Sequence, residues 1–196
     1  MNVLVTIATA MLLIVLCTVG FAYSGLYDVS ARGPHSGPVT WILSTTSHAS
    51  VERRAADIDV PDLADDALMR AGANDFEAMC IGCHGGPGRE PAAVGQGLNP
   101  AAPNLSESAS HMSPAELFWV AKNGIKMTGM PAWGVTHEDD ALWPVVAFMT
   151  RLPELDADGY RALLASAEGM GHHGSDKPAK SAEGDLDGHD DHDHSH

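Results

Sequence analysis

The feature that most constrains this 196-residue chain is a run of five residues, Cys80-Ile81-Gly82-Cys83-His84. In a C-x-x-C-H pattern, one helical turn presents both thiols to the same edge of a porphyrin, where each adds to a vinyl group. The histidine that follows then lies beneath the iron, where its imidazole serves as an axial ligand. The pattern therefore predicts one covalent haem c, attached at Cys80 and Cys83, with His84 as the proximal ligand.

The number of cysteines and the net charge argue against other interpretations of this motif and of the chain. By itself C-x-x-C is also typical of zinc sites and redox-active disulfides, but the chain has only three cysteines and no second pair. Cys17 lies in an apolar run, and Leu16 stands where a small residue is expected before a lipid-modified cysteine. The formal net charge of -15 argues against nucleic acid, whose phosphates would be repelled.

Residues 1–23 are predicted to be a transmembrane anchor. Val3 to Tyr23 carries no charge, and about 20 apolar residues span a bilayer core. The alternative is a cleaved signal peptide, but its apolar region is about 7–15 residues long behind a basic start. No Lys or Arg precedes this stretch, although Gly20-Phe21-Ala22 would serve as a weak cleavage site.

The attachment of c-type haem fixes the expected orientation. Because this haem is attached outside the cytoplasm, the motif and all residues after 24 are expected to face the periplasm from a bacterial cytoplasmic membrane. Residues 24–67 form the predicted linker, in which a helix begins at Ser36-Gly37-Pro38. A flexible tether would be richer in Gly and Ser. This linker is therefore expected to be partly structured and to lie on the membrane or dock on the domain.

Residues 68–153 are predicted to form the domain, from short helices between Gly- and Pro-rich loops. Expected helices run from about 63 to the motif, from 113 to 124, and from about 136 to 152. A further helix is expected in residues 154–168. Ser113-Pro114-Ala115-Glu116 combines an N-cap, a first-turn proline and a capping box. No segment alternates like a strand, so the predicted fold class is all-α.

These motifs resemble a class I cytochrome c domain, close to the third-subunit type found with cbb oxidases. In that family a helix containing a Gly and an aromatic residue precedes C-x-x-C-H and crosses a carboxy-terminal helix. The matching residues here are Gly72 and Phe76 in the first helix, and Trp143, Val146, Ala147 and Phe148 in the second. Two features depart from the pattern. Pro144 lies inside the last helix, where proline removes a hydrogen bond, and the loop from Gly85 to His111 is long.

The resemblance also implies the distal ligand. The family uses a loop methionine, often followed by proline, and Gly129-Met130-Pro131 fits that pattern. A thioether is a soft ligand suited to haem iron, and Pro131 restricts the backbone at Met130. Met127 is the runner-up, and His111 and His137 are the bis-histidine alternatives.

The haem environment is expected to include a proline and two tryptophans. The proximal imidazole needs an acceptor for its other nitrogen, which the family takes from a loop proline. Pro103 matches that position, with Pro100 as runner-up. Trp119 and Trp133 either direct an indole N–H toward a propionate or pack on the porphyrin.

Two filled axial positions leave no coordination place for a substrate, so the site predicts electron transfer rather than catalysis. The expected donors are a quinol-oxidising complex or a dehydrogenase, and the acceptors a terminal oxidase or reductase. Arg89, Lys122 and Lys126 would offer a basic rim for docking. Two alternatives remain open. One is a haem subunit fixed in a larger membrane complex, and the other is a gas- or peroxide-reactive haem sensor.

Residues 169–196 are rich in His and Asp and are predicted to be disordered. Interleaved His and Asp side chains bind divalent metals such as copper, zinc or nickel. The candidate ligands are His172, His173, His189, His192, His194 and His196. The alternative is a solvated acidic tail without a metal.

A domain of the size of residues 68–153 has a small core, to which haem would contribute much of the volume. We therefore expect a Cys80→Ala, Cys83→Ala variant, which cannot attach haem, to be poorly folded. Far-ultraviolet circular dichroism checks this expectation. A native-like helical spectrum from the haem-free variant would contradict it.

Overall fold

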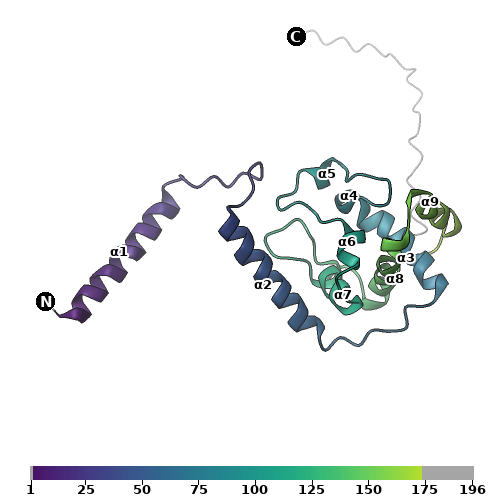
Figure 1. Cartoon of the computed structure of the whole chain (residues 1–196), viewed down its shortest axis with the longest axis horizontal. Helices are drawn as coiled ribbons and strands as arrows, with labels where there is room; N and C mark the ends of the chain where they lie inside the picture. The colour runs from purple at the N-terminus through teal and green to yellow at the C-terminus, as the bar shows by residue number, and fades with distance from the viewer. Residues whose placement is uncertain (1, 174–196) are drawn as a thin grey trace, which may run out of the picture.

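The computed structural model describes residues 2–173 of the chain. In this part all the assigned elements are helices, and none is a strand (Figure 1). The predicted all-α class is therefore confirmed. The helices are α1 Val3–Tyr23, α2 Gly37–Ala55, α3 Asp66–Met79, α4 Ile81–His84, α5 Ala93–Gln96, α6 Leu105–Ala109, α7 Pro114–Asn123, α8 Asp139–Arg151 and α9 Ala157–Ser166. Two short 3₁₀ turns, η1 Trp133–Val135 and η2 Leu152–Glu154, flank α8.

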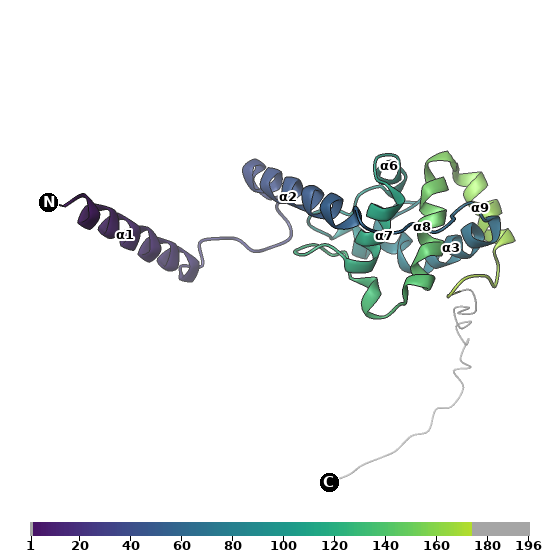
Figure 2. The same cartoon turned by 90° about the horizontal axis from the view of Figure 1, so that it is seen from below.

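Helix α1 lies apart from the rest of the protein in both views (Figures 1 and 2). Within residues 2–173 it is the one helix long and apolar enough to cross a membrane, with 21 residues and a mean hydropathy of 2.6. Two of its three threonines form hydrogen bonds within the helix, since Thr9 and Thr18 each donate to the carbonyl four residues earlier at 2.9 Å. The helix fits membrane anchoring.

Helix α2 docks on the helical domain through its carboxy-terminal half. It begins beside Pro38, which suits the first turn of a helix, and it packs against α7, with Val51 and Ala55 buried. Its amino-terminal half extends beyond the domain (Figure 2), where Trp41 is 68% exposed. A second tie lies just before the helix, where the Asn99 side chain donates to the Gly33 carbonyl at 2.6 Å.

The core forms where α3 crosses α8. Phe76 and Phe148, one from each helix, are fully buried with ring centroids 5.0 Å apart. A β-carbon at Gly72 would overlap the carbonyl group of Pro144, so the backbones of the two helices are in contact. The glycine gives the crossing its close approach, and the proline is accommodated inside α8 at this contact.

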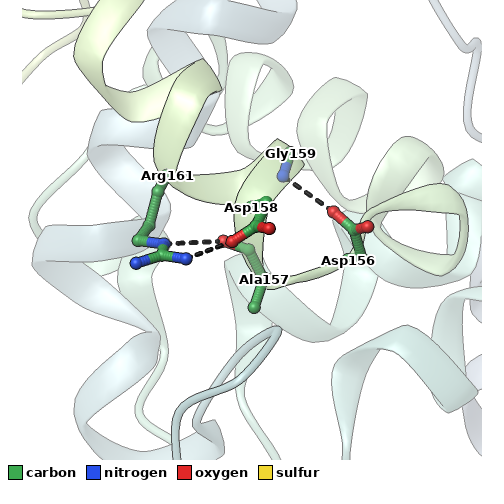
Figure 3. Close-up of polar contacts among 5 residues, drawn as sticks. All are labelled: Asp156, Ala157, Asp158, Gly159 and Arg161. Atoms are coloured by element: carbon green, nitrogen blue, oxygen red, sulfur yellow. Dashed lines mark hydrogen bonds and ion pairs between the residues drawn. The ribbon is translucent and has the colours of Figure 1, made fainter.

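Helix α9 adds Tyr160 to the same core, against Phe76 and Phe148. Its first turn explains why it begins where predicted (Figure 3). The Asp156 carboxylate accepts from the Gly159 N–H at 2.7 Å as an N-cap. In the same turn, Asp158 forms an ion pair with Arg161.

Several element boundaries differ from those predicted. Helix α3 starts at Asp66 rather than near 63, because Asp65 is the N-cap and accepts from the Ala67 N–H at 2.8 Å. Helix α8 starts at Asp139 rather than near 136, since η1 occupies the preceding residues. The short helices α5 and α6 were not predicted. Helix α7 has its predicted capping box between Ser113 and Glu116.

Replacing Gly72 by Ala tests the crossing. The added methyl group must push α3 from α8, and such overpacking costs about 1–3 kcal/mol, more than helix propensity returns. We expect the free energy of unfolding, measured by denaturant titration of the haem-loaded protein, to fall by about 2 kcal/mol. Gly37→Ala, where no atom lies within 4 Å of the new group, is the control. Equal stability of the two variants would disprove the contact.

Candidate functional site

The C-x-x-C-H motif forms a helical turn that directly follows α3. The Cys80 N–H donates to the Phe76 carbonyl at 2.9 Å, and the Cys80 carbonyl accepts from Cys83 and His84 at 3.1 and 3.0 Å. Both thiols therefore come from a single turn, as attachment to one porphyrin edge requires. All three cysteines of the chain lie in the described part, and none is in a disulfide.

The environment of Cys80 argues against a redox-active pair. Burial in the core raises the pKa of the Cys80 thiol to about 12, and the nearby Asp75 and Cys83 act in the same direction. A thiol with such a pKa is protonated at neutral pH, whereas redox-active cysteines have lowered pKa values. The pair is suited to a permanent thioether rather than to thiol–disulfide exchange.

His84 is oriented by a backbone carbonyl. Its Nδ1 lies 2.8 Å from the carbonyl oxygen of Pro103. Because a carbonyl only accepts, Nδ1 carries the proton and the lone pair is on Nε2. Burial lowers the pKa of His84, although the hydrogen bond to Pro103 opposes this shift. The imidazole is therefore neutral at pH 7, which is the form that ligates a metal. The two thiols and this neutral imidazole together fit a covalently attached haem.

The loop that carries Met130 is braced at both ends. The Thr128 hydroxyl donates to the Ile125 carbonyl at 2.8 Å and accepts from the Met130 N–H at 3.1 Å. A β-carbon at Gly124, which has a φ of 63°, would lie 2.7 Å from the Met130 carbonyl oxygen. Met130 is half-buried, whereas Met127 is 77% exposed. This placement favours Met130 over Met127 as a ligand.

The other candidates occupy different settings. Trp119 and Trp133 are half-buried, and Trp133 packs against the hydrophobic core. His111 is exposed. His137 contacts Trp133 edge-on and lies beside His172 and His173. The remaining four tail histidines lie outside the described residues.

The basic rim predicted from Arg89, Lys122 and Lys126 is largely neutralised. Arg89 forms an ion pair with Glu77. Lys122 lies 2.6 Å from the Asp139 carboxylate and over the ring of Phe118. Lys126 is exposed. Arg89 and Lys122 each have an acidic partner, which reduces the local positive charge, and docking through these three side chains stays a prediction.

A polar network behind the motif was missed from the sequence. The Tyr160 hydroxyl donates to the Glu77 carboxylate at 2.7 Å, and the same carboxylate pairs with Arg89. Burial and this carboxylate raise the pKa of Tyr160. The network joins α9, α3 and the loop after the motif. No local signal could reveal it, since Glu77 and Tyr160 are 83 residues apart.

A helix that leads into C-x-x-C-H and crosses the last core helix is the architecture of class I cytochromes c, so the fold and the motif define a cytochrome c domain. The comparison with protein families agrees. Residues 67–149 match the family described as cytochrome C oxidase, cbb3-type, subunit III. The resemblance stated from the sequence is therefore confirmed. Comparisons with curated proteins and with solved structures found no match.

This match supports haem-based electron transfer and a covalent haem c. It fits an electron carrier or an oxidase subunit rather than a catalytic enzyme. Together with α1, it is consistent with a domain held at a membrane.

Tyr160→Phe tests the network. It removes one hydrogen bond to a charged group, so we expect the free energy of unfolding to fall by about 2 kcal/mol. Because folding raises the pKa of Tyr160, its stabilisation is complete below pH ~10 and declines as pH rises above it. Denaturant titrations at several pH values should show this decline in the parent and not in the variant. Tyr27→Phe, at an exposed position, is the control.

Proposed function

We propose that the protein is a membrane-tethered electron carrier with one haem c, attached at Cys80 and Cys83 and ligated by His84 and Met130. When bound, the haem supplies a one-electron couple between ferric and ferrous iron. The observation that carries the proposal is the hydrogen bond of His84 to Pro103. It leaves Nε2 directed away from the protein acceptor, on the turn that presents both thiols.

The chain's own residues would keep the site rigid and closed to substrates. Pro103 fixes the plane of the His84 ring, as second-shell acceptors do for metal-binding histidines. Thr128 and Gly124 hold the backbone at Met130. A methionine ligand also raises the reduction potential. Trp119 and Trp133, both half-buried, are proposed to cover the porphyrin.

We propose that the tether holds this carrier at the periplasmic face of the cytoplasmic membrane. Helix α1 would span the bilayer, and residues 24–67 would connect it to the domain that starts near 68. We propose a quinol-oxidising complex or dehydrogenase as the donor and a terminal oxidase or reductase as the acceptor. Since Arg89 and Lys122 are paired, docking would depend little on basic side chains.

A second candidate is a haem subunit fixed in a larger complex. Two observations favour it: the matching family is described as an oxidase subunit, and α2 docks on the domain through Val51 and Ala55, which limits its reach. Co-purification from gently solubilised membranes distinguishes the two roles. A gas or peroxide sensor has less support, because the Met130 loop is held by its own hydrogen bonds.

Met130→Leu tests the ligand. Loss of the thioether should abolish the long-wavelength absorption band of methionine–iron ligation in the ferric protein, lower the reduction potential, and permit rapid binding of carbon monoxide. Met127→Leu is the matched control and should leave all three unchanged. If Met127→Leu produced these changes and Met130→Leu did not, the assignment would be reversed.

A further inference from the structure

The chain after α9 returns to α3 and is fastened there. The Asn74 side chain donates to the carbonyls of Ala167 and Met170, and the Asp75 carboxylate accepts from the His173 N–H at 2.8 Å. Gly171 has a φ of 83°, and a β-carbon there would lie 2.5 Å from the Ala71 carbonyl oxygen. Segment 167–173 is therefore built onto the domain rather than simply following it.

This docking brings three imidazoles together. His172 and His173 meet His137, which follows η1, and one nitrogen from each ring lies within 4.8 Å of the others. The Nε2 atoms of His137 and His173 are 3.4 Å apart. A hydrogen bond between the rings of His137 and His173 would explain the distance between them. It would not explain why the ring of His172 lies close to both.

The tautomer of His137 suits a ligand. Its Nδ1 lies 2.8 Å from the Thr136 hydroxyl, and that hydroxyl donates to the Trp133 carbonyl at 3.3 Å. With the hydroxyl proton used in this way, Nδ1 of His137 must donate, and the lone pair is on Nε2. That nitrogen faces His173, as expected of a metal-binding histidine oriented by its other nitrogen.

The donor set and its spacing fit zinc. Neutral imidazoles bind Zn²⁺ at about 2.0–2.1 Å in a tetrahedral arrangement, which puts two ligand nitrogens about 3.4 Å apart. The His137 and His173 nitrogens have this separation. Three protein ligands with water in the fourth position is a common zinc arrangement.

A buried carboxylate beside the cluster adds a second, independent observation. Asp75 is fully buried, and among residues 2–173 its Oδ2 has no hydrogen-bond partner. A buried carboxylate lacking full compensation is costly. Its other oxygen, Oδ1, accepts from the backbone N–H of His173, so this carboxylate lies against the segment that carries two of the three histidines.

From these observations we infer that His137, His172 and His173 form a zinc-binding site that fastens the carboxy-terminal segment to the chain just beyond the Met130 loop. The site is separate from the haem ligands and uses residues of the domain as well as of the tail.

The test uses the full-length, haem-loaded protein in detergent. His189, His192, His194 and His196 are replaced by Ala in the background, so that only the proposed site and the remaining surface histidines can bind. Titration with zinc in competition with a chromophoric chelator should give one zinc per chain. Zinc should also raise the thermal unfolding temperature, because the three imidazoles converge only in the folded state.

In this background His172→Ala should weaken zinc binding at least tenfold and remove the thermal shift. Because His172 is exposed, we expect this substitution to leave the fold intact. An unchanged haem absorption spectrum verifies this. His48→Ala, also exposed and on α2, is the control and should bind zinc like the background. His137→Ala should match His172→Ala.

The inference fails if the background binds no zinc, or if His172→Ala binds as tightly as His48→Ala. Neither result bears on the electron carrier, which depends on the spectra of the Met130 and Met127 variants.

Discussion

The backbone contact between α3 and α8 at Gly72 is the constraint on which the rest of the domain depends. Helix α3 runs directly into Cys80, and α8 follows the Met130 loop and η1. The angle and separation of these two helices therefore set the positions of both proposed haem ligands. Because Gly72 lets the backbones touch Pro144, the crossing is fixed by hard contact rather than by adaptable side chains.

Around that crossing, polar groups are used to hold segments of irregular chain. Pro103 fixes an imidazole, Thr128 closes the methionine loop, and Glu77 joins the loop after the motif to α9. Each bond connects a short, weakly structured segment to a helix or a proposed ligand. A redox site benefits from this arrangement, since electron transfer is fastest when oxidation and reduction require little movement.

Local signals predicted much of this structure. A few neighbouring residues were enough to predict four features: the motif turn, the capping box of Ser113 and Glu116, the apolar helix α1 and the start of α2. Contacts between distant residues were not predictable, because no short pattern encodes them. Tyr160 with Glu77, and His137 with His172 and His173, are of this kind. Gly72 was matched to the family from the sequence, but its backbone contact with the carbonyl of Pro144 was not predictable.

The docking of α2 also determines how far the domain can move away from α1. A 19-residue helix is about 28 Å long, and its far half is fixed to α7. Because Asn99 also holds Gly33, only residues 24–32 can act as a free tether, with a reach of at most about 32 Å. With α1 in a membrane, such a tether would keep the domain close to the lipid surface and raise its local concentration there.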